Sequence, residues 1–457
     1  MTALTPAFTL PSAAAATASA GAPHRALPPD DALREELHNE VHARPSARIR
    51  LPALVVSLAV LNQGVTRADE CAHLRRLPGQ DHLTPADLDG NFLRLRGANH
   101  TIKWERHGEF TRYAIVQPLP DSALLGATEP ELLWALAVDA EWLRQIPGRT
   151  VVAVKLVMLE HDISDPHAVL ALSQRWLGGR SVVASLLGNG HSIAVTNFRL
   201  RPSGFERMLV IAPPQTSDTR AGRISQRLLE METYRLMALR GLPVAKALAP
   251  VLAAAEAGLA DITGKLEARL ASEGDLLDTL IHVAAGVERA TAEHAYRFAA
   301  TQAYATLVHQ RINEMREKPI SGTQTLGEFM QRRLTPAIAT VAATAQRLAS
   351  LSQRIERVSA LLRTRVDIAT EMQNQQLLAK LTKGQDLQLS LQTTVEGLSI
   401  AAISYYVVSL LLYLAKALKY AGLPINPELA TGALIPVVLL LVWKATQRVH
   451  AKLHRPH

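Results

Sequence analysis

The stretch "GLSIAAISYYVVSLLLYLA", residues 397–415, contains no charged side chain. At about 1.5 Å per helical residue, it is long enough to cross a hydrocarbon core of about 30 Å. Its apolar residues cover every face of the expected helix instead of one stripe, which argues against a hairpin buried in a soluble core. Lys416 and Lys419 follow, where their side chains can reach a headgroup layer. The stretch therefore predicts a membrane-spanning helix.

A second apolar run, "LATGALIPVVLLLVW", covers residues 429–443 after a short turn-rich loop. Pro436 lies within it, and membrane helices tolerate proline when neighbouring groups satisfy the freed carbonyl. Trp443 stands at its end, a position typical of an interfacial anchor. We therefore expect a transmembrane hairpin over 397–443, with spans at about 397–418 and 429–445.

The two ends of the chain indicate its orientation. The tail 444–457 has four basic residues and no acidic one, which predicts a cytoplasmic C-terminus. With two spans, the part before residue 397 is then cytoplasmic as well. Residues 1–29 carry no Lys or Arg before Arg25 and are rich in Ala, Ser and Thr, so we expect a disordered tail, with a signal peptide as the alternative.

Composition narrows the class of protein. The 457 residues exceed what one hydrophobic core organises, and 48% hydrophobic content with only 4% aromatics favours helices. The net charge is +8, but the basic residues are spread along the helical half, without a basic patch interleaved with aromatics or a zinc-finger pattern. We therefore expect no nucleic-acid partner. Cys71 is the single cysteine, which excludes an internal disulfide and a cysteine-rich metal site.

Residues 30–215 mix strand and helix patterns, which predicts an α+β domain. Strands are expected at 91–119 (two or three), at 149–160, at 205–213, and in a hairpin at 181–200 that turns at Gly188-Asn189-Gly190. Helices are expected at 65–77, in a short segment that ends before Pro45, and at 128–147, where Thr128 and Glu131 form a capping-box pattern. The run 51–61 is simply apolar.

Strand patterns disappear after Pro214, and helices dominate. Helices over 221–318 break near 241–243 and 272–274, and a long helix begins at Pro336. Its apolar residues are spaced by three and four, as in a coiled coil with one irregular step. They are Ile338, Val341, Ala345, Leu348, Leu351, Ile355, Val358 and Leu362. This seam must be buried on helices of the same chain or on other copies, and we expect a homo-oligomer.

The fold class is thus an α+β N-terminal cytoplasmic domain, then an all-α region with a long stalk helix and a C-terminal two-helix transmembrane hairpin. The predicted segments are 1–29 (tail), 30–215 (α+β), 216–325 (helical), 326–396 (stalk), 397–443 (hairpin) and 444–457 (basic tail).

"ELHNEVHARP", residues 36–45, places His38 and His42 four residues apart, as on one face of a helix that holds a divalent cation. It lacks a third ligand and is not an H-E-x-x-H motif. A structural role is favoured, with Glu40 and Arg44 as possible ligand or interface residues. In that interpretation the buried stripe consists of Leu33, Leu37 and Val41.

"KWERHGEFTRY", residues 103–113, gathers Trp104, Glu105, Arg106 and His107. These residues could form a ligand site or an oligomer interface with an arginine anchor. The favoured alternative is an edge hairpin stabilised by cross-strand charge pairs.

The first span contains a polar face formed by Ser399, Tyr406, Ser409 and Tyr413. Such a face can line a pore or hydrogen-bond to a neighbouring helix. The chain has no P-loop, no nucleophile elbow and no dinucleotide fingerprint, so we predict no enzymatic activity and no cofactor, with a divalent cation as the one possible ligand.

Four segments together resemble a bacterial family of uncharacterised, membrane-anchored proteins of unknown function. They are "LREELHNEVHARP" (33–45), "KWERHGEFTRY" (103–113), "EWLRQIPG" (141–148) and "LSIAAISYYVVSLLLYLAKAL" (398–418). The resemblance runs from about residue 30 over nearly the whole chain. It implies a membrane location and supplies no reaction. Together with the two apolar runs and the basic tail, it leads us to expect a multi-pass protein of the bacterial inner membrane with both termini cytoplasmic.

The order of segments also looks like the CorA-type divalent-cation channels, which assemble as pentamers around their first spans. The Gly-Met-Asn tripeptide of those channels is missing, and the nearest stretch is "GLPIN" (422–426). We therefore expect a non-enzymatic, cytoplasmic-facing oligomeric scaffold or binding protein, with a CorA-like channel of altered selectivity as the alternative.

Overall fold

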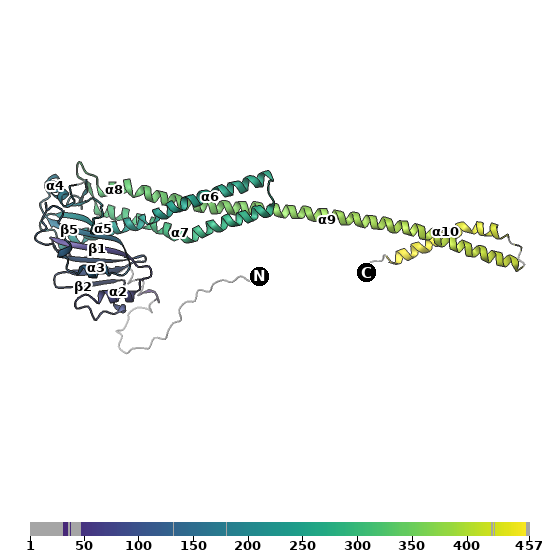
Figure 1. The fold of residues 1–457 in the computed structure, drawn as a ribbon, viewed down its shortest axis with the longest axis horizontal. Coiled ribbons are helices and arrows are strands. Elements are labelled where there is room, and N and C mark those ends of the chain that lie inside the picture. The colour runs from purple at the N-terminus through teal and green to yellow at the C-terminus, as the bar shows by residue number, and fades with distance from the viewer. Residues whose placement is uncertain are drawn as a thin grey trace. The chain divides into compact units, whose positions relative to one another are not determined.

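The computed structural model describes residues 31–34, 37, 47–130, 132–179, 181–421, 424 and 426–453. It divides into two compact units, each considered separately below. The first unit comprises Met1–Ala254 and Val287–Ser350, and the second comprises Ala255–Gly286 and Leu351–His457. The first contains the sheet, and the second contains helices, as the ribbon shows (Figure 1).

In the described part of the first unit, one nine-stranded sheet has the order β2-β3-β4-β1-β5-β8-β7-β6-β9. The strands are β1 (Ala53–Leu61), β2 (Phe92–Arg96), β3 (Thr101–Arg106), β4 (Phe110–Pro118), β5 (Arg149–Glu160), β6 (Val183–Leu187), β7 (Ser192–Thr196), β8 (Glu206–Ala212) and β9 (Lys318–Pro319). Neighbours pair antiparallel, except β5 and β8, which pair parallel. The strands expected within 91–119, 149–160, 181–200 and 205–213 are confirmed, and the apolar run 51–61 forms the central strand β1.

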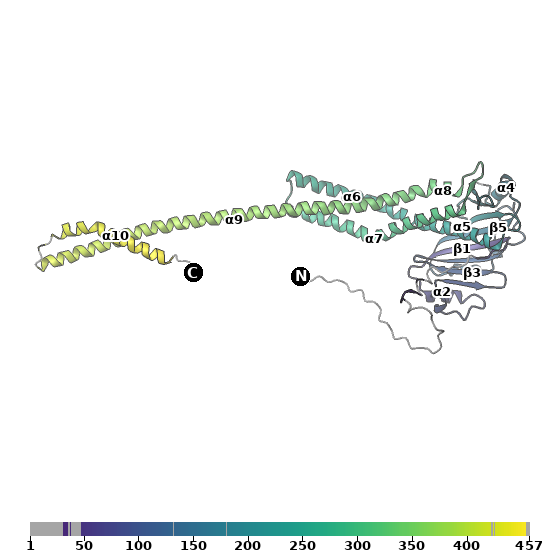
Figure 2. The ribbon, with the colours of Figure 1, turned by 180° about the vertical axis from the view of Figure 1, so that it is seen from behind.

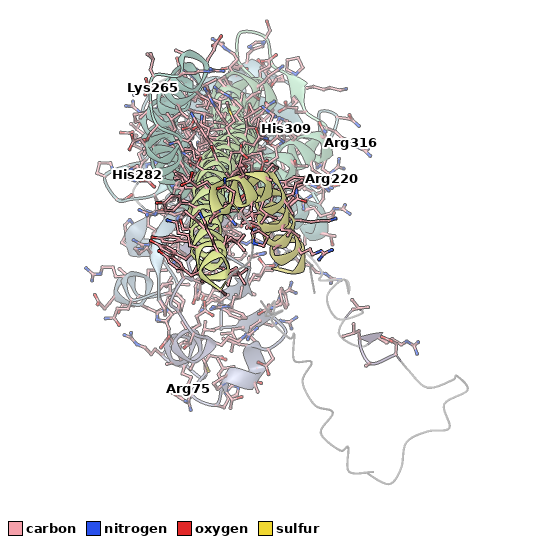
Figure 3. The ribbon with its side chains drawn as sticks, turned by 90° about the vertical axis from the view of Figure 1, so that its right-hand side faces the viewer. Arg75, Arg220, Lys265, His282, His309 and Arg316 are labelled. Atoms are coloured by element: carbon pink, nitrogen blue, oxygen red, sulfur yellow. The ribbon has the colours of Figure 1, made fainter. Side chains whose placement is uncertain are left out.

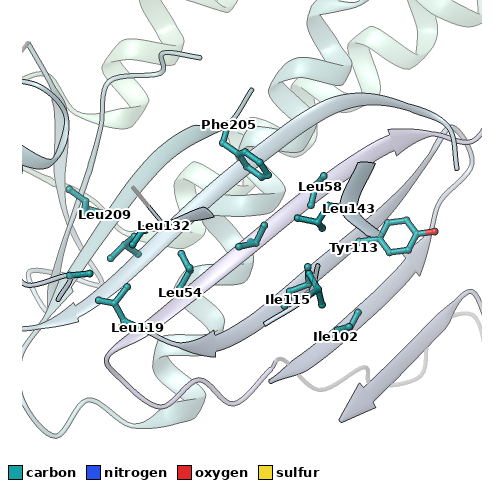
Figure 4. Packing of buried hydrophobic residues seen from close by; sticks show 14 of the residues in the cluster. Leu54, Leu58, Ile102, Tyr113, Ile115, Leu119, Leu132, Leu143, Phe205 and Leu209 are labelled. Carbon is teal, nitrogen blue, oxygen red and sulfur yellow. The ribbon is translucent and has the colours of Figure 1, made fainter. Parts of the chain in front are cut away.

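β1 is buried along its whole length because both faces of the sheet are covered. Leu54, Val56, Leu58 and Val60 face one hydrophobic core, and the alternate residues face another. The first core, drawn in Figure 4, includes side chains of the short helices, such as Leu143. The second core contains residues of α5 and α7. The sheet therefore separates two cores of different composition.

Short helices cover the first face of the sheet: α2 (Arg67–Leu74), η1 (Pro85–Leu88), η2 (Leu133–Ala135), α3 (Ala140–Arg144) and α4 (Pro166–Trp176). α2 confirms the helix expected within 65–77, and Thr66 caps it with a reciprocal capping box.

The helix predicted over 128–147 is wrong, because only η2 and α3 are helical there. The backbone of this segment bonds to neighbouring elements instead: the Glu129 amide donates to the Arg175 carbonyl at 3.2 Å, and the Gln117 side chain donates to the Ala135 carbonyl and accepts from the Ala137 amide. Asp139 is the actual N-cap of α3. Glu131 of the expected capping box lies outside the described residues.

Long helices follow the sheet strands: α5 (Asp218–Leu239), α6 (Gly241–Ala268), α7 (Glu273–Met315) and the shorter α8 (Leu326–Arg333). Both predicted breaks, near 241–243 and 272–274, are confirmed. α5 lies along the second face of the sheet (Figure 2). Gly222 lets α5 lie against the segment that precedes β1, because a Cβ there would lie 1.7 Å from the Ala47 carbonyl oxygen. β9 extends the sheet beyond β6.

The predicted long helix is α9, which begins at Thr335 and continues without interruption to Tyr420. In the first unit, Ile338, Val341 and Leu348 are buried; in the second unit, Leu351, Ile355, Val358 and Leu362 are buried as well. The same chain therefore buries the predicted seam as far as Leu362. Every residue from 370 to 395 is exposed.

Within the second unit, α9 packs on the segment that contains the turn between α6 and α7. The Arg365 guanidinium donates to the Leu266 carbonyl and lies 3.7 Å from the Glu273 carboxylate. The last helix, α10 (Pro427–Leu453), lies beside the end of α9 (Figures 1 and 3).

Candidate functional site

The histidine motif falls outside the described residues at His38, Glu40, His42 and Arg44. Two members of its expected buried stripe are described, and that expectation is wrong for both: Leu33 is 55% exposed and Leu37 61% exposed. No group of three or more His, Cys, Asp or Glu side chains that could hold a metal ion occurs among the described residues. The divalent-cation site therefore stays a prediction.

The 103–113 motif forms β3, the following turn and the start of β4. β3 lies inside the sheet, because β2 pairs with its outer edge, so the expected edge position is wrong. The expected cross-strand charge pair is present: Glu105 lies opposite Arg112 in the register of β3 and β4. Strand alternation then separates the four predicted residues between the two faces of the sheet.

Two of those residues face the short helices. Trp104 is fully buried in the first core. Arg106 donates to the Glu70 carboxylate of α2 at 2.7 Å and to the Val65 carbonyl at 2.8 Å. His107 stacks on Phe110 in the turn, with ring centroids 4.5 Å apart. These contacts hold the hairpin in place.

The opposite face of β3 carries a buried cluster that we call the α5 charge network: Lys103, Glu105, Arg112, Glu230 and Arg311. Glu105 accepts from Lys103 at 2.7 Å and from the Arg112 Nε at 2.8 Å. Arg112 also lies 3.6 Å from Glu230 of α5, and Glu230 accepts from Arg311 of α7 at 2.6 Å. Three cations and two carboxylates thus connect two strands with two helices.

Electrostatics keep Glu105 ionised. Burial alone raises the pKa of Glu105, but Arg112 and Lys103 outweigh burial and lower it to about 2. Burial lowers the pKa of Lys103, and Glu105 opposes that effect. A carboxylate with so low a pKa is not a proton donor near neutral pH, so the chemistry available to Glu105 is ionic binding and positioning.

A second cluster under α5 is a carboxylate pair, Glu206 of β8 with Glu232 of α5. Arg235 binds Glu232 through its Nε at 2.8 Å and lies 3.8 Å from Glu206. Its guanidinium also lies 5.0 Å from the centre of the Phe198 ring. Burial, together with the like charge of Glu232, raises the pKa of Glu206 well above its usual value. The pair can therefore retain a proton inside the protein.

Sequence reasoning missed the α5 members of both clusters. Their signal is present in "LLEMETYR" (228–235), where Glu230 and Glu232 fall among apolar residues that are buried. A charged side chain inside the buried stripe of an amphipathic helix requires a buried partner of opposite charge. Glu230 finds its cations on Arg112 of β4 and Arg311 of α7, both distant in sequence, whereas Glu232 finds Arg235 three residues later on α5 itself.

The polar face of the predicted first span lies on α9 in the second unit. Tyr406 and Tyr413 are 68% and 69% exposed, Ser399 is exposed and Ser409 is half-buried. Ser404, in contrast, is buried. The two tyrosines are thus available to lipid or to another helix.

Three helical stretches of the described chain are long and apolar enough to cross a membrane, judged by length and composition: Asp218–Ala268, Leu326–Tyr420 and Pro427–Arg448. The first was not predicted. The chain's own fold buries 33% of its most apolar window, against 6% and 11% for the other two.

Comparison with protein families gives one decisive result. The model of a family described as "Protein of unknown function (DUF3422)" matches residues 29–453. The chain belongs to this family. The resemblance drawn from the four sequence segments is therefore confirmed. The comparisons with curated proteins and with solved structures gave no match, so the likeness to CorA-type channels rests on the order of segments alone.

Proposed function

We propose that this DUF3422 protein is a scaffold or binding protein anchored in the bacterial inner membrane, with its sheet-containing domain in the cytoplasm. One observation carries the proposal. α9 leaves the region in which its own chain buries its seam, exposes every residue from 370 to 395, and then enters the uncharged stretch 397–415. A stalk helix that connects a folded domain to a membrane anchor is expected to pass from protein to water and then to lipid in this order.

Two spans account for the apolar helices. The stretches that end at Tyr420 and begin at Pro427 have almost no burial by their own chain, which suits lipid contact. The Asp218–Ala268 stretch has a third of its apolar window buried by protein, so we assign it to the soluble domain. The basic tail after Trp443 supports a cytoplasmic C-terminus.

The proposed scaffold is an oligomer. The exposed part of α9 carries large apolar side chains that water contacts unfavourably. They are Ile368, Met372, Leu377, Leu378, Leu381, Leu387, Leu389, Leu391 and Val395. A helix from a second copy would bury them, as in a coiled coil.

The α5 charge network and the carboxylate pair support a binding or structural role for the domain. The charged side chains of both clusters form ion pairs with residues on several elements, and these pairs fix α5 on the sheet. The proposed role is non-enzymatic.

A channel is the second candidate function, on one observation. Ser399, Tyr406 and Tyr413 are spaced by seven residues, and the structure leaves both tyrosines exposed. Copies arranged around an axis could turn this face inward to line a path for cations.

Membrane fractionation tests the primary proposal. The full chain should sediment with membranes and resist extraction by alkaline carbonate, whereas a chain that ends at Thr394 should appear in the soluble fraction. A full chain released by carbonate would overturn the anchor. Loss of folding in the truncated chain is checked by circular dichroism of the soluble product.

A further inference from the structure

The first unit contains a cleft of about 610 Å³ that lies outside the clusters described above; one lining residue, Glu314, contacts them through its ion pair with Arg311. Three elements form it: the turn between β6 and β7, the first turns of α5, and the end of α7. Its polar lining consists chiefly of Asn189, His191, Arg220, Arg223, Arg227 and Arg316. Figure 3 shows Arg220 and Arg316 on the same side of this unit.

The lining carries an excess of positive charge. Glu314 is the one acidic residue among the described residues of the lining, and two cations already neutralise it, Arg311 at 2.7 Å and Arg227 at 3.4 Å. Arg220, Arg223 and Arg316 form no ion pair with any residue that the structure describes. Three arginines that line one cleft without acidic partners of their own repel each other, and an anion relieves that repulsion.

The backbone holds this cluster in place. The amide of Gly188 donates to the Met315 carbonyl at 2.8 Å, and the amide of Asn189 donates to the Arg316 carbonyl at 3.1 Å. These bonds fasten the β6–β7 turn to the end of α7. Gly188 has φ +60° and Asn189 φ +63°, which the tight turn requires, and a Cβ on Gly188 would lie 3.4 Å from the Arg220 guanidinium.

Two further groups add donors. Ser217, the N-cap of α5, lines the cleft and makes no side-chain capping bond, so its hydroxyl can donate to a ligand; Asp218 in the first turn offsets the positive end of the helix dipole there. His191 lies 3.2 Å from the Thr216 hydroxyl. Burial and the charge of Arg220 lower the pKa of His191, which leaves a neutral imidazole at neutral pH.

We propose that this cleft binds a small anion that carries a phosphate group. Several arginine forks match the multiple acceptor oxygens of a phosphate better than the two of a carboxylate. The volume is that of a small-metabolite site. No Phe, Tyr or Trp lines the cleft among the described residues, so a stacked nucleobase has no platform there.

Calorimetry on the full chain, reconstituted in phosphatidylcholine nanodiscs, tests this proposal. Inorganic phosphate and glycerol 3-phosphate are titrated at low salt, and both should bind saturably with an affinity that falls as salt rises. The double variant R220Q/R316Q should weaken binding by tenfold or more, about the effect of one lost charged contact. The double variant R96Q/R333Q removes the same charge from exposed sites elsewhere and should bind as the parent does.

Nanodiscs that contain phosphatidic acid distinguish the two sources of a phosphate group. If glycerol 3-phosphate binds equally in both lipid compositions, the ligand is soluble; if phosphatidic acid abolishes the heat, the cleft takes a lipid headgroup. Saturable binding by neither probe in the millimolar range would overturn the proposal. So would equal weakening by R220Q/R316Q and R96Q/R333Q, because that result would indicate a general charge effect. Melting curves confirm that each variant is folded.

Discussion

Glu105 and Arg112 lie directly opposite each other on β3 and β4, and their ion pair is covered by α5. Glu105 and Arg112 are close in sequence. The second carboxylate near Arg112 comes from a distant part of the chain, Glu230 of α5. The cation is thus shared between a strand partner and a helix partner. Removing it affects both contacts at once.

The variant Arg112→Met should therefore destabilise the protein strongly. It leaves Glu105 and Glu230 buried with one fewer cation, and breaking a buried pair in this way costs about 3–5 kcal/mol. Thermal unfolding of the full chain in detergent measures the effect. The matched control is Arg144→Met, because the Arg144–Glu141 pair is exposed and worth about 0–1 kcal/mol. Equal melting temperatures for the two variants would contradict a structural role for the network.

The buried carboxylate pair predicts an unusual dependence of stability on pH. Because the folded pKa of Glu206 is raised, its contribution to stability is complete below the unfolded pKa and is lost as pH rises through the folded value. The variant Glu206→Gln mimics the protonated form, so it should stabilise the protein at pH 8 more than at pH 5. Each unit of raised pKa corresponds to about 1.4 kcal/mol. Glu267→Gln, at an exposed position, should show no such difference.

The stability that Glu105 contributes should depend on pH in the opposite direction from that of Glu206. Glu105 has a pKa of about 2, below that of an unfolded glutamate, so the stability it contributes is present above roughly pH 4.3 and is lost as pH falls toward 2. The parent should therefore lose stability more steeply in this window than Glu105→Gln, measured by urea unfolding at several pH values. Parallel curves would show that the ion pairs do not determine the pKa.

The hairpin topology can be checked with paired reporters. Alkaline phosphatase fused after Pro424, between α9 and α10, should be active because that loop is expected in the periplasm. Green fluorescent protein fused after His457 should fluoresce because the C-terminus is expected in the cytoplasm. The reverse pattern of activities would invert the proposed orientation.

If copies of the chain associate through α9, charged substitutions at its exposed apolar residues should weaken the oligomer. In mass photometry of detergent-solubilised protein, Leu381→Glu with Leu391→Glu should shift the mass toward monomer, since both side chains are exposed in one chain. Gln385→Glu with Gln388→Glu adds equal charge to the same exposed segment and should leave the mass unchanged. A parent protein that is strictly monomeric would remove both the oligomer and the channel.

Cation flux into proteoliposomes tests the channel alternative. Flux of divalent or monovalent cations that Tyr406→Leu or Ser409→Leu abolishes, and that Tyr405→Leu leaves intact, would support a pore. An intact oligomer without flux for any tested cation would leave the scaffold as the better account.

The sequence alone determined the features that depend on local pattern. Uncharged residues 397–415, the three- and four-residue spacing from Ile338 to Leu362, and the turn at Gly188-Asn189-Gly190 each predict an element that the structure contains. The reason is that helix and strand periodicity act over a few residues, so neighbours in sequence suffice to specify them.

Only the tertiary structure decided which side chains meet. Glu129 and Gln117 tie down the backbone around 129–137, so the helix pattern at 128–147 is overridden by contacts with distant elements. The two buried clusters, and the cleft of arginines, likewise join strands to α5 and α7 across long sequence separations. Charges repel or pair according to distance in space, and that distance is set by how the sheet and helices pack, which no local pattern contains.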